Sequence, residues 1–329
     1  MEDLNSQQTK QRVYERIQQT IARKKRQRTQ RIYLTVASLI IVTLSAVIYR
    51  QTSSPADLPN LSADQLYADI SAGSVSINGR ERQSIADIKP EDQLPLHIHR
   101  DSNMLVVTSR QSSRSKDDEI ILRAGIGGLY KVILDDGSIV YLNSNSELRY
   151  YGNLIEDRQV RLQGEAFFEV ANRFKENRRQ PFTVHTDQQE IEVLGTQFNV
   201  VSRENQEQTV LTEGSIRLKS LKKREENTLS PGDMVELSAD GSLAKSKVPI
   251  EEYTAWKDGI IYFEDRSLMD ILTELKRIYP VEFTPKQVPQ KKFTVYLKRD
   301  RPLSDILAMI EQSGQLDVQL KNQEIIFSK

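Results

Sequence analysis

The sequence predicts a membrane-anchored, mainly β protein with a single transmembrane helix, a periplasmic all-β domain and a small C-terminal α+β domain. Three observations predict this fold class. An uncharged run occupies residues 32–49. Short alternating strand patterns separated by turn signals fill residues 118–250. A repeat with an offset of 35 residues, "DRSLMDILTEL" from Asp265 and "DRPLSDILAMI" from Asp300, marks the last part of the chain.

The uncharged run has the length and the flanking charges of a transmembrane helix. As a helix its eighteen residues reach roughly 27 Å, close to the ~30 Å core of a bilayer. Eight Lys or Arg residues lie in 12–31, whereas 50–69 contain only Arg50. The positive-inside rule therefore places residues 1–31, a short basic helix, in the cytoplasm. We expect a single-pass protein of the bacterial inner membrane, in contact with lipid, whose bulk is periplasmic.

Two other interpretations of this run stay open. A buried core helix can be equally apolar, although core helices rarely follow so basic a segment. A cleaved signal peptide has a shorter apolar core and a small-residue cleavage site, whereas "RQTSSPADLP" follows here.

Residues 50–110 are predicted to be a linker with short strands, and residues 111–250 a β domain. In "LYKVILDDGSIVYLN" two alternating runs surround Asp136-Gly137, which is a strong hairpin signal. His97 and His99 alternate on a predicted surface strand, which gives little support for a metal site. Many short strands at this spacing predict a sandwich or a solenoid-like roll.

Residues 251–329 are predicted to form the small α+β domain, because each copy of the repeat has a helical apolar stripe. Pro302 suits the first turn of the second helix. Strand-like runs surround both helices and give the order β-α-β-β-α-β-β, with the helices on one sheet face. The two stripes are Leu268, Ile271, Leu272 and Leu275, and Leu303, Ile306, Leu307 and Ile310.

Composition and motifs exclude several function classes. The formal net charge is zero, so no global basic field attracts nucleic acid. The chain has no cysteine, which excludes disulfides, thiolate zinc sites and cysteine nucleophiles. No G-x-S-x-G, H-E-x-x-H or P-loop motif occurs. We therefore expect no enzyme acting on an external substrate, no cofactor and no metal.

One peptide bond, Gly195-Thr196 in "VLGTQFNV", is a candidate for self-cleavage. A threonine hydroxyl can attack the preceding carbonyl when the backbone is strained, and water then hydrolyses the ester. Glycine leaves that carbonyl sterically open. The alternative is a glycine bulge in a strand, and chemistry alone favours that alternative.

Seven motifs extend from about residue 120 to the end of the chain: "GLYKVILDDGSIVYLNSNSELRY", "RQVRLQGEAFFEVA", "PFTVHT", "IEVLGTQFNV", "TVLTEGSIRL", "LSPGDMVEL" and "YTAWKDGIIYFEDRSLMDILTELKRIY". They resemble the FecR family of sigma-factor regulators, in the family's order. The resemblance implies an inner-membrane protein that pairs with an extracytoplasmic-function sigma factor inside the cell. It also implies a signal from the signalling domain of a TonB-dependent outer-membrane transporter that carries an iron chelate or a glycan. The C-terminal domain looks like the secretin and TonB short N-terminal fold of Bacteroidota members. Self-cleavage at the matching Gly195-Thr196 is a further implication.

Partner-binding candidates lie near both ends of the chain. A narrow apolar stripe before the span is the candidate surface for the sigma factor, although an isolated helix this short is marginal in water. The last strand is the candidate for β-augmentation by the transporter, with internal pairing as an equal alternative. The candidates are Val13, Tyr14, Ile17 and Ile21, and Ile325, Ile326 and Phe327.

Two other function classes remain open. The family usually has a sizeable helical anti-sigma domain before the membrane, whereas 31 residues precede the span here. This favours a membrane-tethered periplasmic adaptor without a sigma partner, unless the start codon is misassigned. A periplasmic glycan-binding or hydrolytic β protein would present exposed aromatic platforms or a carboxylate cleft. The single Trp256 is expected to pack between domains instead.

Overall fold

The computed structural model describes residues 62–79, 83–88, 96–101, 104–109, 117–152, 154–204 and 206–328. Within these ranges no helix is both long enough and apolar enough to cross a bilayer. The predicted transmembrane helix at 32–49 and the predicted cytoplasmic helix at 1–31 lie outside the described residues. The described residues belong to one compact unit, which contains a β sandwich and a C-terminal α+β domain.

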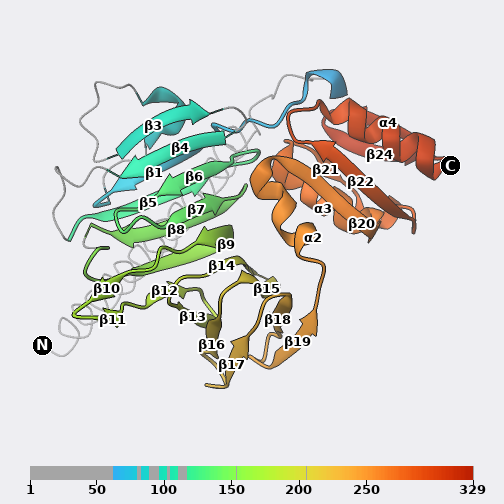
Figure 1. Cartoon of the computed structure of the whole chain (residues 1–329). Coiled ribbons are helices and arrows are strands. Elements are labelled where there is room, and N and C mark those ends of the chain that lie inside the picture. The colour runs from blue at the N-terminus through green and yellow to red at the C-terminus, as the bar shows by residue number, and fades with distance from the viewer. Residues whose placement is uncertain are drawn as a thin grey trace, which may run out of the picture. The chain divides into compact units, whose positions relative to one another are not determined.

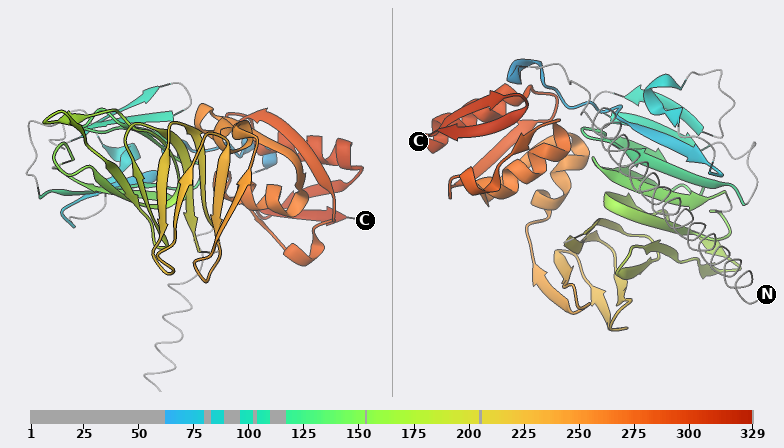
Figure 2. Two further views of the ribbon diagram at one scale, coloured as in Figure 1. Left: turned by 60° about the horizontal axis from the view of Figure 1, so that its bottom comes forward. Right: turned by 180° about the vertical axis from the view of Figure 1, so that it is seen from behind.

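The β sandwich has two layers of strands that face each other across one apolar core (Figure 1; a second side is seen in the left view of Figure 2). All neighbouring strands pair antiparallel except β9 with β12 and β4 with β6. The first layer has the order β2 (Gln83–Ser84), β1 (Gly73–Ile77), β5 (Glu119–Ala124), β8 (Ser146–Tyr151), β9 (Gln159–Glu169), β12 (Phe182–His185), β13 (Gln189–Val193), β16 (Ile216–Ser220) and β17 (Glu226–Leu229). The second has the order β3 (Leu96–Asp101), β4 (Met104–Ser109), β6 (Tyr130–Ile133), β7 (Ile139–Leu142), β9, β14 (Gln197–Arg203), β15 (Gln206–Glu213), β18 (Asp233–Leu237) and β19 (Leu243–Lys247).

Strand β9 belongs to both layers and bends between them at Gly164. Its first half pairs with β8 and β12, and its second half pairs with β7 and β14. Gly164 has a φ of +98°, and a Cβ there would lie 2.3 Å from the Oγ atom of Ser146. Glycine permits this backbone conformation and this close approach, because it has no Cβ.

The predicted hairpin is confirmed, whereas the predicted start of the β domain is not where the fold begins. Strands β6 and β7 pair antiparallel around a turn that contains Gly137, with a φ of +83°. Strand β1 pairs with β5 and β4 pairs with β6, so the strands before residue 111 belong to the same sandwich. Short strands were predicted here, but their pairing with β5 and β6 joins residues more than 20 positions apart, which local alternation does not contain. A small hairpin, β10 (Phe174–Lys175) with β11 (Arg178–Arg179), follows β9.

The C-terminal domain has the predicted order β-α-β-β-α-β-β. Its strands form two small sheets, β20 with β22 and β21-β24-β23, where one sheet was expected. The two predicted helical stripes are buried in its core. Pro302 precedes the second helix as its N-cap, with a ψ of 154°, and so lies outside the first turn. The elements are α2 (Ile250–Thr254), the 3-10 helix η4 (Ala255–Asp258), β20 (Ile260–Ser267), α3 (Leu268–Ile278), β21 (Glu282–Phe283), the 3-10 helix η5 (Pro285–Gln287), β22 (Lys292–Lys298), α4 (Leu303–Gly314), β23 (Asp317–Lys321) and β24 (Glu324–Ser328).

The core of the C-terminal domain also includes a segment from near the start of the described chain. Leu66 follows the 3-10 helix η1 (Ala63–Gln65), is 2 % exposed and belongs to this core. In Figure 2 this blue segment lies beside the orange and red C-terminal elements and then continues into the sandwich. The core therefore joins residues that are more than 200 positions apart in the sequence. The short 3-10 helix η2 (Ile85–Asp87) follows β2 in the sandwich.

Candidate functional site

The candidate functional site is the junction at which the C-terminal domain covers the outer face of the second sandwich layer. Along β14, Phe198 and Val200 face the apolar core between the layers. Asn199 and Val201 point to the opposite face, yet both are almost fully buried. A cleft of about 730 Å³ lies at this junction. Its lining includes Glu165, Arg203, Tyr253, Trp256, Arg277 and Arg299.

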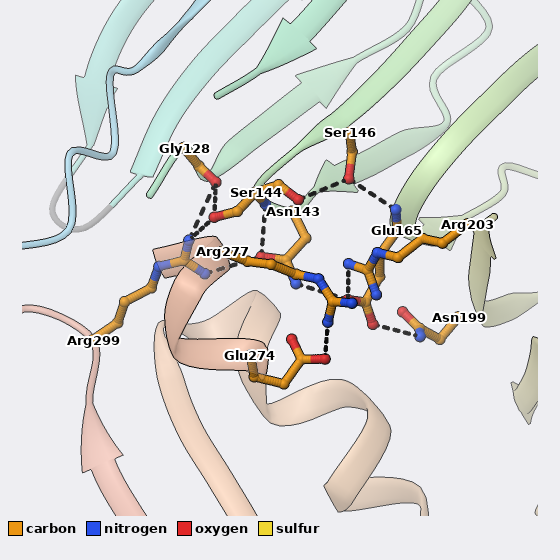
Figure 3. A network of polar contacts seen from close by, with 10 residues as sticks. All are labelled: Gly128, Asn143, Ser144, Ser146, Glu165, Asn199, Arg203, Glu274, Arg277 and Arg299. Atoms are coloured by element: carbon orange, nitrogen blue, oxygen red, sulfur yellow. Dashed lines mark hydrogen bonds and ion pairs between the residues drawn. The ribbon is translucent and has the colours of Figure 1, made fainter. Parts of the chain in front are cut away.

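Arg299, which directly follows β22, carries the main polar contact across the junction (Figure 3). Its Nη1 atom donates to Oδ1 of Asn143 at 3.0 Å, and its Nη2 atom donates to the carbonyl of Gly127 at 2.9 Å. Nη2 also donates to the carbonyl of Gly128 and to Oγ of Ser144. These acceptors lie in the two loops that join β5 to β6 and β7 to β8. One side chain of the C-terminal domain thus holds two loops of the sandwich.

Burial lowers the pKa of Arg299 to about 10, and nearby Tyr279, Glu165 and Glu274 oppose this effect. The guanidinium therefore stays charged at neutral pH. Its four hydrogen bonds in the described structure all go to neutral oxygens, and its Nε atom is buried there without a partner. Because a buried cation requires such hydrogen bonds, the position of Arg299 depends on both loops.

Glu165 extends this network into the sandwich. Its Oε2 atom accepts from Nδ2 of Asn143 at 2.9 Å and from Nη2 of Arg203 at 3.2 Å. Its Oε1 atom accepts from Nδ2 of Asn199 at 3.1 Å. Figure 3 shows the line of contacts from Arg299 through Asn143 and Glu165 to strand β14. Glu165 is therefore a structural carboxylate with three hydrogen-bond donors.

The rest of the junction combines cation–π contacts with a backbone hydrogen bond. Nζ of Lys257, in η4, lies 5.6 Å from the ring centre of Tyr141 and 5.5 Å from that of Phe167. These distances are within the range of cation–π attraction. The backbone N–H of Gly127 donates to the carbonyl of Arg277, at the end of α3, at 2.8 Å. Cation–π contacts and a backbone hydrogen bond therefore also hold the domain on the sandwich.

The carboxylates that line the cleft are held by arginines. The carboxylates of Glu165, Glu252 and Glu274 are each paired with an arginine. Within the described ranges, no cluster of three or more His, Cys, Asp or Glu residues could hold a metal ion. Each of these ion pairs lies within one folded part, so the two parts are connected by the contacts of Arg299, Lys257 and Gly127 described above.

Comparisons with known proteins agree with this two-part architecture. The family model described as "FecR protein" matches residues 120–217, and the model described as "FecR, C-terminal" matches residues 260–327. Together they span half of the chain, in the sandwich and in the C-terminal domain. The chain belongs to the FecR family. The sequence resemblance is therefore confirmed.

Two crystal structures of a proposed anti-sigma factor from Parabacteroides distasonis ATCC 8503, at 1.65 and 2.50 Å resolution, are similar to this FecR-family chain. Each has 25 % sequence identity, a TM-score of 0.55 and a match over 64 % of this chain, which covers 98 % and 99 % of the crystallised chains. A search among curated proteins finds no match.

The structure places the predicted cleavage bond, Gly195-Thr196, in the loop between β13 and β14, where the chain changes layer. Gly195 has a φ of +149°, and a Cβ there would lie 2.2 Å from Oδ1 of Asn172. Thr196 is 4 % exposed, and its Oγ1 atom donates to the carbonyl of Ser215 at 3.1 Å. The alternative of a bulge within a strand does not describe this site, because the glycine lies outside the strands.

The cleavage bond and the junction lie at opposite ends of β14. Thr196 precedes the strand, whereas Arg203 ends it and reaches Glu165. Seven residues at about 3.3 Å each place the two ends roughly 20 Å apart. The structure therefore does not unite the two sites, although one strand links them.

The candidate residues of the last strand are less accessible than predicted. Strand β24 pairs with β23 over its length and with β21 at Glu324 and Ile325. Ile325 is 2 % exposed in the core, so it is not available to a partner. Ile326 is half-buried, and Phe327 packs on the core. The stripe Val13, Tyr14, Ile17 and Ile21 lies outside the described residues.

Sequence reasoning missed Arg299, Asn143 and Ser144. They have no motif, and Arg299 contacts residues 155 and 156 positions away in the sequence. The one local signal at this place is the Gly-rich stretch 125–128, in which the carbonyls of Gly127 and Gly128 accept from Arg299.

Proposed function

We propose that this FecR-family protein is a single-pass signal transducer that regulates an extracytoplasmic-function sigma factor. The family matches and the relationship to a proposed anti-sigma factor support sigma-factor regulation in general. The finer proposal adds a cytoplasmic segment at residues 1–31 that contacts the sigma factor. It also adds a periplasmic C-terminal domain that receives the signalling domain of a TonB-dependent transporter.

The junction is the observation that carries this proposal. A receptor domain must change the state of the rest of the protein, and this requires interactions that differ between the two states. Arg299 and Lys257 provide such contacts, because both connect the C-terminal domain to the outer face of the sandwich. Docking of the transporter on the domain changes these contacts, and the change passes through the sandwich toward the membrane.

A two-hybrid assay tests the cytoplasmic part. Residues 1–31 fused to one reporter half should interact with the cognate sigma factor fused to the other half. The matched control replaces Ile17 and Ile21 with Asp, which removes the apolar stripe while keeping the segment's length. If the unmodified segment gives no signal with a confirmed start site, the protein is a membrane-tethered periplasmic adaptor instead.

The exposed face of the β20-β22 sheet is the proposed docking surface for the transporter. Tyr296 is 67 % exposed, and its ring centre lies 6.0 Å from that of Tyr262 on the neighbouring strand. Exposed aromatic residues are common anchors of protein interfaces. Pull-down by a transporter signalling domain should weaken at least tenfold in Tyr296→Ser. The matched control, Tyr151→Ser, removes a tyrosine that is 49 % exposed on the sandwich and should bind normally.

Self-cleavage at Gly195-Thr196 is the second part of the proposal. The Thr196 Oγ1 atom attacks the Gly195 carbonyl carbon, the C–N bond breaks, and the hydroxyl proton passes to the new amine. Water then hydrolyses the ester, which leaves a Gly195 carboxylate and restores the threonine hydroxyl. The positive φ of Gly195 supports this proposal. Gly214 also supports it, because the absence of a Cβ leaves space beside the Gly195 carbonyl oxygen, which would lie 3.0 Å from that Cβ.

A denaturing gel tests the cleavage. Wild type should give two fragments, whereas Thr196→Ala should remain whole. Thr212→Ala is the matched control, because Oγ1 of Thr212 also donates to a backbone carbonyl, that of Gln197. It should still cleave. An uncleaved wild-type chain under the same expression conditions contradicts the proposal.

A further inference from the structure

Residues 62–72, here called the strap, contact the C-terminal domain and then lead into β1 of the sandwich. The strap contains only one short 3-10 helix, η1, whose Gln65 side chain accepts from the Ser62 N–H at 3.1 Å. So short a helix has little stability of its own. The position of the strap is therefore set by its contacts with the two folded parts.

The first half of the strap is bound by the C-terminal domain. Leu66 is buried among the side chains of α3 and α4, and Ala63 and Ala68 pack against the same core. The backbone carbonyl of Leu66 accepts from the N–H of Leu303, at the start of α4, at 2.9 Å. This hydrogen bond occupies one of the donors that a helix start leaves without an internal partner. Displacement of α4 therefore removes both the apolar and the polar contacts of Leu66.

The second half of the strap is bound by the sandwich. The carbonyl of Ala72 accepts from the Gly125 N–H and from the Tyr130 hydroxyl, each at 2.7 Å. The carbonyl of Ile70 accepts from the Leu129 N–H at 3.3 Å. The end of the strap is thus fixed independently of the C-terminal domain, and a change in that domain acts on the first half alone.

Three backbones meet at Gly127, which has a φ of +81°. A Cβ at this position would lie 2.5 Å from the backbone nitrogen of Asp69 in the strap and 3.0 Å from the carbonyl oxygen of Ile278 in α3. Glycine is required here because any side chain would push the strap and α3 apart. Gly127→Ala therefore disturbs the strap with little direct effect on either apolar core.

We propose that the C-terminal domain holds the strap in place and releases its first half when the domain is displaced. The inference rests on the proposed function and adds a route by which the signal passes from the C-terminal domain to the membrane. Residues 50–61 separate the strap from the predicted span, so release acts on the chain next to the membrane. The signal then reaches the membrane side directly, in addition to any path through the sandwich.

Cysteine labelling of the full-length chain tests this, since the chain has no cysteine of its own. Single-cysteine variants Leu66→Cys, Tyr67→Cys and Leu218→Cys are treated with a maleimide in the native state. Leu66 and Leu218 are buried, in the C-terminal core and in the sandwich core, and Tyr67 is 54 % exposed. Only the cysteine at position 67 should react rapidly. When Gly127→Ala is introduced into each of the three variants, the labelling rate at position 66 should rise at least tenfold, and the rates at 67 and 218 should stay unchanged.

A second perturbation, Leu303→Ala, acts from the side of the C-terminal domain and should give the same pattern. An unchanged rate at position 66 in both backgrounds overturns the proposal, because the strap then stays bound without these contacts. An equal increase at 218 also overturns it, because the whole unit would then open together. The assay needs neither sigma factor nor transporter, so its outcome is distinct from failure of the proposed function.

Discussion

Arg158 and Asp136 form an ion pair with almost no solvent contact, at 2.8 Å from Nε to Oδ2. The same guanidinium donates to the carbonyls of Ala171 and Gln180. Removing one partner of a buried pair leaves the other charge without compensation, which typically costs about 3–5 kcal/mol. Arg158→Met should therefore lower the free energy of unfolding by about this amount in chemical denaturation.

Two variants control this prediction. Arg161→Met changes an exposed arginine on β9, where the side chain is 57 % exposed, and should have little effect. Adding Asp136→Asn to Arg158→Met should recover part of the loss, because the unpaired charge is then absent. If the double variant loses as much free energy of unfolding as Arg158→Met and Asp136→Asn lose together, the two residues are not coupled.

Glu207 is a buried carboxylate with no basic partner in the described structure. Burial raises its pKa, and hydrogen bonds from Thr186, Ser202 and Gln189 partly oppose the effect. The folded state therefore binds this proton more tightly than the unfolded state, in which the pKa is about 4.3. The associated stability is present at low pH and is lost as the pH rises through the folded pKa.

Glu207→Gln should be more stable than wild type at neutral pH and should lose this part of the pH dependence. Thermal unfolding midpoints between pH 4 and pH 8 measure both effects. Glu236→Gln, an exposed glutamate on β18, is the control and should follow the wild-type curve. If the unfolding midpoints of Glu207→Gln and wild type differ by the same amount at every pH, titration of Glu207 does not contribute to the pH dependence of stability.

At the scale of elements, the sequence patterns succeeded where strands and helices are determined locally. The Asp136-Gly137 turn predicted the β6-β7 hairpin, and the repeat at Asp265 and Asp300 predicted α3 and α4. The bend in β9 was not predicted, because Gly164 lies inside an unbroken alternating run. Its role depends on Ser146, a contact that local periodicity does not contain.

Gly164→Ala should destabilise the sandwich through two effects at this bend. A non-glycine residue in a left-handed conformation costs about 1–2 kcal/mol, and crowding against Ser146 adds about 1–3 kcal/mol. Gly79→Ala is the matched control, because its φ is +68° but nothing lies within 4 Å of its added Cβ. Denaturant midpoints should fall much further for Gly164→Ala. Equal losses would show that the backbone conformation alone decides the effect.

At the scale of the whole molecule, the apolar patterns identified the β region and the α+β domain but not how the two are joined. The two parts have separate apolar cores. Arg299 and Leu66 link them through contacts that are distant in sequence. Buried polar contacts of this kind depend on the assembled fold, so no window of sequence indicates them. The sequence therefore indicated Trp256 at the junction, whereas the polar contacts of the candidate site could be found only from the structure.

This organisation predicts that the sandwich and the C-terminal domain unfold together only while Arg299 is present. The single Trp256 lies at the junction and reports on the domain by fluorescence, whereas far-UV circular dichroism mainly reports on the larger sandwich. In the wild type the two denaturant transitions should coincide, as a cooperative unit requires. Arg299→Met leaves the oxygens of Asn143, Ser144, Gly127 and Gly128 without this donor. Each charged hydrogen bond lost is worth about 1.5–3 kcal/mol.

In Arg299→Met the fluorescence transition should therefore move to lower denaturant, while the circular dichroism transition stays near its wild-type midpoint. Lys298→Met, a change at the exposed neighbouring residue, should leave both transitions coincident. If the transitions remain coincident in Arg299→Met, the aromatic contacts of Lys257 and the strap are sufficient to couple the parts. If they are already separate in the wild type, the domain moves independently of the sandwich, and coupling through Arg299 has no role in signalling.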